Sequence, residues 1–363
     1  MHVPDGFINA PVSAAAGAVA ATAVAVSLRG ARRELGGTSR SSEAESGGER
    51  TAPLAGLVAA FIFAVQMLNF PVAAGTSGHL LGGALAAILV GPFTGVLCVS
   101  VVLLMQGILF ADGGLTALGV NITNMAVVTT VVAYAVFRGL VKLLPRKRRS
   151  ITVSAFAAAV ISVPAAAAAF TLIYAIGGTT DVPIGQVFTA MVGVHVLIGI
   201  GEAVITALTV GAVIAVRPDL VYGARGLTTP LKLRVNGELV DTPAAEPVPV
   251  AARSHRKVWL AGLATSLVLA GFVSFYASAN PDGLEKVASD KGIDAKAEDH
   301  AAADSPLADY GVEGLTNSRI SGGLAGVIGV GVTIVAGTGV FWTVRRRRTP
   351  ENQSGPSQVG GSV

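Results

Sequence analysis

The sequence predicts an all-α polytopic membrane protein, in which about seven segments form one bundle and two further helices form a C-terminal unit. The chain has 363 residues, of which 52% are hydrophobic and only 13% are charged, and its mean hydropathy is +0.65. No soluble domain of this size needs so much apolar surface. The 45 glycines suit helices that pack in lipid, where small residues let backbones approach closely.

Nine apolar segments account for the predicted crossings, since a spanning helix needs about 20 residues. They lie at residues 8–28, 54–74, 80–91, 93–111, 119–141, 151–176, 186–216, 258–279 and 320–343. The segment 80–91 is too short to span by itself and is separated from the next by Gly91 and Pro92. Two interpretations of it stay open, a half-helix and a re-entrant piece.

Basic clusters predict the orientation of these segments, because cytoplasmic loops are enriched in Lys and Arg. Nine crossings from an outer N-terminus put every cluster in the cytoplasm, whereas treating 80–111 as one crossing breaks this parity. The clusters are Arg29 to Arg33, Arg138 to Arg149, Arg217 to Arg234, Arg253 to Lys257 and Arg345 to Arg348. We therefore expect a bacterial plasma-membrane protein surrounded by lipid, with an outer N-terminus and a cytoplasmic C-terminus. The net charge of +4 comes mainly from these loops and predicts no nucleic-acid partner.

Composition also divides the chain. Residues 1–217 form the main transmembrane domain, and the proline-rich residues 218–257 are predicted to be a cytoplasmic linker. Residues 258–345 form two helices around an acidic outer loop at 280–319, and 346–363 are predicted to be a disordered cytoplasmic tail. The single cysteine, Cys98, excludes a disulfide framework. We expect no signal peptide, because no basic residue precedes the first apolar stretch.

The first two residues form a potential chelate for a divalent transition metal. The Met1 amine, the His2 amide nitrogen and an imidazole nitrogen of His2 would close a five-membered and a six-membered ring. Such rings favour the square-planar, nitrogen-rich geometry that Ni²⁺, Cu²⁺ and some Co²⁺ complexes accept. The large residue at position two predicts that Met1 is retained and its amine stays free.

A fourth nitrogen is available from His79, in a loop predicted to lie on the same side as His2. The surrounding small residues of 74–80 let the backbone turn sharply and approach a ligand. His79 alone could equally be a helix-capping residue, but its pairing with His2 favours a metal ligand. The two histidines together would complete a four-nitrogen plane.

Polar residues elsewhere in the apolar segments have two interpretations each. Asp112, Asn121 and Asn124 are predicted either to orient the chelating terminus or to hydrogen-bond between helices. His195 and Glu202 lie seven residues apart and therefore share a helix face. For this pair a structural contact is favoured over a role in metal passage.

Several of these motifs occur together in a known family. The opening Met-His-Val-Pro-Asp-Gly-Phe resembles the start of CbiM/NikM proteins, the substrate-capture membrane components of energy-coupling factor (ECF) transporters for cobalt and nickel. The loop 78–80, the stretch 112–125 and the segment 195–206 are similar to later blocks of that family. Residues 280–288 resemble the PDGLE domain, a CbiN/NikN-like accessory module that is fused here. Val3 and the long loop 34–53 depart from the family pattern without touching a proposed donor.

The resemblance implies a function and partners. The metal ligands would be Met1, His2 and His79, with Co²⁺ or Ni²⁺ as cargo and no cofactor. A coupling membrane protein (CbiQ/NikQ-like) and a cytosolic ATPase (CbiO/NikO-like) would supply energy, because the chain has no phosphate-binding loop and is not expected to be an enzyme. Two alternatives stay open: a partner-independent metal channel or secondary transporter, and a rhomboid-like protease using Ser77 and His195.

Overall fold

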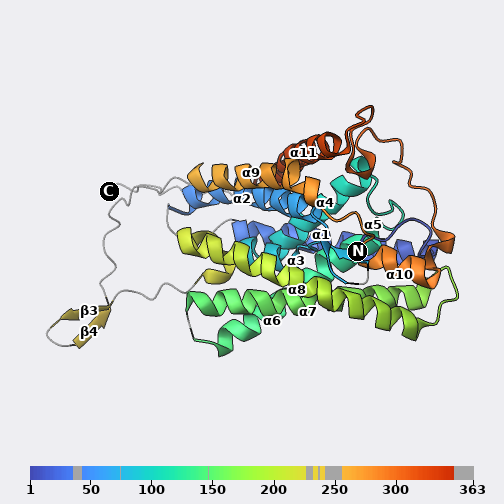
Figure 1. Cartoon of the computed structure of the whole chain (residues 1–363). Helices are drawn as coiled ribbons and strands as arrows, with labels where there is room; N and C mark the ends of the chain where they lie inside the picture. The colour runs from blue at the N-terminus through green and yellow to red at the C-terminus, as the bar shows by residue number, and fades with distance from the viewer. Residues whose placement is uncertain are drawn as a thin grey trace, which may run out of the picture.

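The computed structural model describes residues 1–35, 43–73, 75–145, 147–225, 232–235, 238–241 and 256–346. Long helices run side by side along one axis (Figure 1). Within the described residues, seven helical stretches are long and apolar enough to cross a membrane. The prediction of an all-α polytopic membrane protein is confirmed. In chain order the helices of the main bundle are α1 (Ala10–Leu35), α2 (Glu43–Gln66), α3 (Gly83–Val90), α4 (Pro92–Leu109), α5 (Leu118–Asn121), α6 (Thr129–Leu143), α7 (Arg148–Gly177) and α8 (Ile184–Val216).

The N-terminal segment, residues 1–9, lies at one end of this bundle, which we call the site end. The basic residues that terminate α1 and α6, among them Arg32, Arg33 and Lys142, lie at the opposite end. Between α5 and α6 the chain forms a π-helical turn, η1 (Ile122–Val128), and the three elements make one continuous rod. Such turns interrupt the regular α-helical register and are frequent at functional sites.

The short segment around residues 80–91 crosses the bundle in two parts. The helix α3 is entirely buried, and its eight residues cover only about 12 Å. The residues before it, from His79 to Gly82, are not helical. At the far end, the Glu34 carboxylate of α1 accepts hydrogen bonds from the Phe93 and Thr94 N–H groups of α4, at 3.1 and 2.7 Å. The chain thus reaches the opposite end through a half-helix preceded by irregular backbone.

Two short strands hold the loop before α3. The strand β1 (Phe70–Pro71) pairs antiparallel with β2 (Ser77–Gly78), and His79 follows directly. A second antiparallel pair, β3 (Lys232–Val235) with β4 (Glu238–Asp241), occurs where the sequence predicts a linker. Also in that linker, η2 (Pro218–Leu220) and η3 (Tyr222–Ala224) follow α8. Much of the predicted linker and all but the first residue of the predicted tail lie outside the described residues.

The C-terminal unit packs along α2 and reaches over the site end. Its elements are α9 (Arg256–Gly271), η4 (Val273–Tyr276), α10 (Gly283–Lys291), η5 (Ile293–Lys296), η6 (Ala308–Tyr310) and α11 (Ser318–Arg346). The helix α11 approaches α2 at Gly56, where an added Cβ would lie 2.4 Å from the Thr338 hydroxyl. Small residues at this crossing permit close backbone packing in lipid. The helix α10 lies against α8 at the site end (Figure 1).

Candidate metal site

The N-terminal segment is fixed in the bundle by hydrogen bonds with the loop and the helix that follow α4. Asn121 contacts the backbone of Val3 twice: its Oδ1 accepts from the Val3 N–H at 2.7 Å, and its Nδ2 donates to the Val3 carbonyl at 3.1 Å. The Asp5 carboxylate accepts from the backbone N–H groups of Leu115 and Thr116, at 3.2 and 2.7 Å. These contacts hold residues 1–5 in one buried conformation.

Two glycines after Asp112 allow this close approach. Gly113 has φ +84°, and a Cβ there would lie 3.2 Å from the His2 Cβ. A Cβ at Gly114 would lie 2.3 Å from the backbone nitrogen of Asp5, which no side chain can accommodate without displacing the segment. The Gly114 N–H also donates to the Val3 carbonyl at 2.9 Å. The Asp-Gly-Gly motif therefore forms the surface on which the terminus lies.

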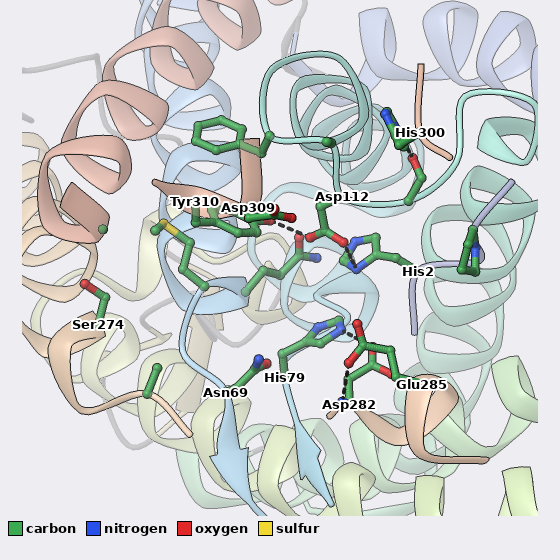
Figure 2. A pocket seen from close by; sticks show the side chains of 18 of the residues that line it. His2, Asn69, His79, Asp112, Ser274, Asp282, Glu285, His300, Asp309 and Tyr310 are labelled. Carbon is green, nitrogen blue, oxygen red and sulfur yellow. Dashed lines mark hydrogen bonds and ion pairs between the residues drawn. The ribbon is translucent and has the colours of Figure 1, made fainter. Parts of the chain in front are cut away.

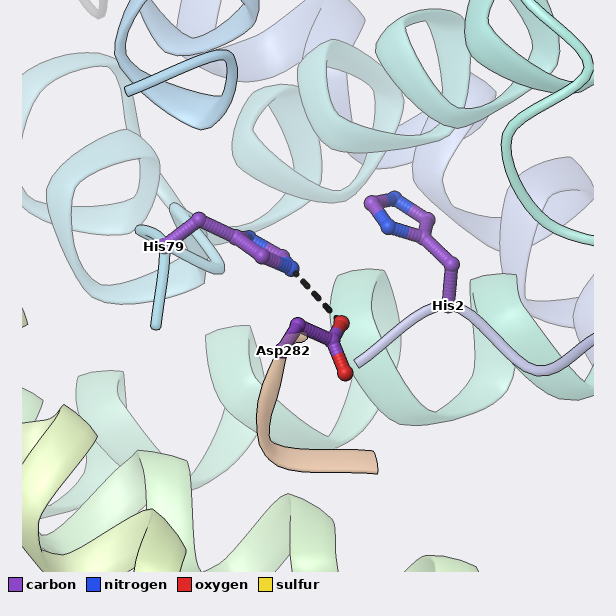
Figure 3. Close-up of side chains that lie close together, drawn as sticks. All are labelled: His2, His79 and Asp282. Carbon is purple, nitrogen blue, oxygen red and sulfur yellow. Dashed lines mark ion pairs between the residues drawn. The ribbon is translucent and has the colours of Figure 1, made fainter. Parts of the chain in front are cut away.

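Nitrogen atoms of Met1, His2 and His79 lie near one another at the terminus, and Figure 3 shows the two imidazoles with Asp282. The Met1 amine lies 2.7 Å from His79 Nε2, and the His2 and His79 rings stack with centroids 5.1 Å apart and planes inclined by 18°. His79 Nδ1 lies 3.0 Å from the Leu80 carbonyl, so that Nδ1–H donates there and the Nε2 lone pair faces the amine. Among the described residues, the backbone N–H of His2 has no hydrogen-bond partner, which is rare for a buried amide.

Asp282 brings a carboxylate from the C-terminal unit to these nitrogens. Its Oδ2 lies 2.6 Å from the Met1 amine and 3.5 Å from His79 Nε2. Its Oδ1 caps α10 by accepting from the N–H groups of Leu284 and Glu285, in a capping box with Glu285. Burial alone would raise the pKa of Asp282, but the terminal ammonium and His79 outweigh it and hold that pKa well below its usual range.

Asp282 is the residue of this cluster that sequence reasoning did not include among the candidate ligands. One ligand atom each from His2, His79 and Asp282 lies within 4.8 Å of the others. The sequence contained one signal, because Asp followed three residues later by Glu is a helix-start motif that fixes the carboxylate in place. It held no signal that this helix start would meet residue 1.

The imidazole of His2 is held between two oxygen atoms, one of which, from Asp112, is shown in Figure 2. Its Nδ1 lies 3.1 Å from Asp112 Oδ1, and its Nε2 lies 3.3 Å from Gln106 Oε1. Burial lowers the pKa of His2 to about 4, although Asp112 opposes this shift, so the ring is neutral at pH 7. A neutral imidazole carries one N–H and donates to only one of these oxygens at a time.

The remaining polar residues singled out from the sequence have different positions. Glu202 accepts from the backbone N–H groups of Leu81 and Gly82, at 2.6 and 3.2 Å, and thus anchors the segment that carries His79. His195 Nδ1 contacts the carbonyl of Met191 at 2.7 Å, and no hydrogen bond joins His195 to Glu202 in the described part of the chain.

Asn124 and Ser77 stay outside the donor cluster. Both side-chain polar atoms of Asn124 are buried without a hydrogen-bond partner, so within the described residues it holds neither the terminus nor its imidazoles. The Ser77 hydroxyl donates to the Asn280 carbonyl at 2.8 Å, and its described contacts do not include His195. The protease alternative therefore lacks its nucleophile–base pair.

A cavity of about 540 Å³ opens beside the donor atoms, between the main bundle and the C-terminal unit (Figure 2). Acidic side chains on its wall include Asp112, Asp282 and Glu285. His300, on the same wall, contacts the Gly113 carbonyl through Nε2 at 3.1 Å.

The fold and the cluster define a class: a multi-pass helical membrane protein whose terminus, buried in the bundle, presents nitrogen donors next to a polar cavity. Residues 2–220 match the family model described as the cobalt uptake substrate-specific transmembrane region, CbiM, and residues 256–346 match the PDGLE domain. The chain belongs to the CbiM family and carries a fused PDGLE domain.

Individual relatives agree with this assignment. A candidate metal transport protein of Haloquadratum walsbyi is 41% identical over 226 residues, which cover 61% of this chain and 94% of that protein. A candidate fused nickel transport protein, NikMN, of Archaeoglobus fulgidus is 38% identical over 61% of this chain and 68% of its own length. The crystal structure of a transition metal transporter is similar to this chain, with a TM-score of 0.50 and 27% identity. The match covers 60% of this chain and 93% of the transporter chain.

Proposed function

We propose that this chain is the membrane component that captures Co²⁺ or Ni²⁺ from outside the cell for import. The observation that carries the proposal is the approach of the Met1 amine to His79 Nε2 at 2.7 Å, beside the His2 amide, for which the described residues offer no hydrogen-bond partner. The donors would be the Met1 amine, the His2 amide nitrogen, His2 Nδ1 and His79 Nε2. A six-membered chelate ring requires Nδ1 rather than Nε2 of His2.

The donor set supports capture of a metal that accepts a square plane. Four nitrogens at a rigid, buried terminus suit Ni²⁺ and Co²⁺, whereas Zn²⁺ prefers a tetrahedron. Binding must release protons from the amine and the amide, so affinity is expected to fall at acid pH. Asp282 lies 2.6 Å from the amine and can accept a hydrogen bond from it until the metal arrives.

The transport cycle is proposed to need partners. A coupling membrane protein and a cytosolic ATPase of the ECF type would move the captured ion, with residues 1–9 and the PDGLE loop outside and the basic ends of α1 and α6 in the cytoplasm. Uptake in cells expressing the chain with and without an ATP-hydrolysing partner tests this part. Full uptake by the chain alone would instead support a channel or secondary transporter.

The capture site is tested by the metal content of the purified protein. We compare the wild type with a form carrying one extra residue before Met1, and with His2→Ala and His79→Ala. Each change should abolish stoichiometric nickel or cobalt, because each removes a donor or displaces the amine. His300→Ala is the matched control, since His300 lines the same cavity but lies on the Gly113 carbonyl. Equal metal in the extended form and the wild type would refute the chelate.

A further inference from the structure

The two nitrogens of His2 have different tasks in the proposed chelate, and the inference below rests on that proposed function. Metal binding through Nδ1 requires the tautomer in which the proton is on Nε2. In this structure Nδ1 lies 3.1 Å from Asp112, an acceptor that favours the tautomer with the proton on Nδ1. That tautomer cannot bind a metal through Nδ1. The acceptor that favours the correct one is Gln106 Oε1, 3.3 Å from Nε2.

Gln106 can serve this purpose in only one orientation of its amide. Turned the other way, its NH₂ group would face His2 Nε2 and would favour a proton on Nδ1. Gln106 projects from an apolar stretch of α4 and is fully buried, so bulk solvent does not reach its amide. The group that sets it is the hydroxyl of Tyr310, which accepts from Gln106 Nε2 at 2.9 Å.

The direction of the Tyr310 hydroxyl is fixed in turn by Asp112. The hydroxyl donates its single proton to Asp112 Oδ2 at 2.5 Å. The hydroxyl can therefore offer only a lone pair to Gln106. The sequence of contacts runs from Asp112 through Tyr310 and Gln106 to His2, and at its end the Gln106 Oε1 atom can only accept from His2 Nε2.

Packing holds the Tyr310 ring in place independently of its hydroxyl. The ring stacks on Phe110 with centroids 4.9 Å apart and lies 6.3 Å from Phe63. The backbone N–H of Asp309 donates to the Phe110 carbonyl at 2.9 Å. Tyr310 belongs to the C-terminal unit, whereas Gln106, Asp112 and His2 belong to the main bundle.

We infer that Tyr310 is a positioning residue of the metal site: its hydroxyl orients Gln106 so that the His2 imidazole presents Nδ1 to the metal. Through Gln106, the fused C-terminal unit thus favours the His2 tautomer that leaves Nδ1 free for the metal, against the competing acceptor Asp112. Partners that orient a metal-ligating histidine typically change metal affinity by about 10–100-fold when removed.

The test measures Ni²⁺ affinity of the full-length protein, by competition with a chelator, in four forms: wild type, Tyr310→Phe, Gln106→Met and the double variant. Tyr310→Phe keeps the ring packing and deletes only the hydroxyl. We expect each single variant to bind about 10-fold more weakly. The double variant should bind no more weakly than Gln106→Met, because Tyr310 acts through Gln106.

Tyr276→Phe is the matched control, since Tyr276 lies in the same unit and is 73% exposed. Pulsed EPR of the Cu²⁺-loaded protein adds a readout that a merely structural role leaves unchanged, because it detects the hydrogen bond at the remote imidazole nitrogen. That signal should change in Tyr310→Phe and Gln106→Met but not in Tyr276→Phe. Unchanged affinity in Tyr310→Phe, or losses that multiply in the double variant, would overturn the inference. Failure of the wild type to bind nickel would refute the proposed function instead.

Discussion

Replacing Asp282 should destabilise the metal-free protein in two separable steps. Its carboxylate contacts the buried terminal ammonium at 2.6 Å and also caps α10. Asp282→Asn leaves a side-chain oxygen for the cap but removes the charge, and an uncompensated buried charge costs about 3 kcal/mol or more. Asp282→Ala also removes the cap, at about 1 kcal/mol more.

Thermal unfolding in detergent, with a chelator present, measures both steps. At about 2–4 °C per kcal/mol, Asp282→Asn should melt roughly 6–12 °C below the wild type, and Asp282→Ala a few degrees lower still. Asp290→Asn is the control, because Asp290 pairs with Lys286 on an exposed face of α10 and such pairs contribute about 0.3–0.5 kcal/mol. If Asp282→Asn and Asp290→Asn have the same melting temperature, the buried ion pair contributes nothing to stability and the reasoning is wrong.

Asp282→Asn also shows whether Asp282 stabilises the metal-free site and the metal-loaded site equally. A divalent ion with a deprotonated amide leaves one net positive charge where the ammonium was. Asp282 therefore faces a similar charge in both states, and Asp282→Asn should weaken the loaded protein about as much as the empty one. Metal affinity should change far less than the roughly 100-fold that 3 kcal/mol would give. A 100-fold change would show that Asp282 prefers one of the two states.

Three further outcomes are expected. Glu202→Gln should lower nickel affinity about 10-fold without loss of helix, because one anchor of the His79 segment is removed. Thr206→Val should leave the nickel affinity unchanged, because the buried Thr206 hydroxyl has no partner in the described residues. The folded-state pKa of His2 is about 4, below its ordinary value, so the unfolded state binds more protons between about pH 6.5 and 4. As the pH is lowered from about 6.5 to about 4, the melting temperature of the metal-free protein should therefore fall, and it should fall less in His2→Ala. Gly283→Ala should lower the melting temperature, since its Cβ would lie 2.7 Å from a side chain of α8 and overpacking costs about 1–3 kcal/mol; Gly185→Ala, with nothing within 4 Å, should not.

Sequence reasoning could predict the parts of the site that depend on local pattern. The spacing of apolar segments predicted the helices, and the loop after α4 was predicted to lie on the same side of the membrane as the terminus. The outcome for Asn121 and Asn124 shows where the pattern fails. Their spacing predicts one face of an α-helix, but Ile122–Val128 form a π-helical turn, whose wider register places the two side chains differently.

Contacts between distant segments could not be predicted. Asp282 and Tyr310 reach the site from beyond a linker that carries no information about where the C-terminal unit docks. Gln106 lies among apolar residues of α4, where a single amide side chain is normally interpreted as a hydrogen-bonding contact between helices. Tyr310 has φ +55°, an unusual backbone conformation that no sequence pattern near it indicates.

The arrangement of residues 1–9 has a consequence for the order in which the protein is made. The terminus leaves the ribosome first, yet its contacts come from residues 112–121, from Gly177 and Thr179, and from Asp282 and Glu298. The first residues synthesised are therefore the last to reach their final positions, after most of the chain has been inserted. A bound metal would then report that synthesis and docking of the C-terminal unit are complete.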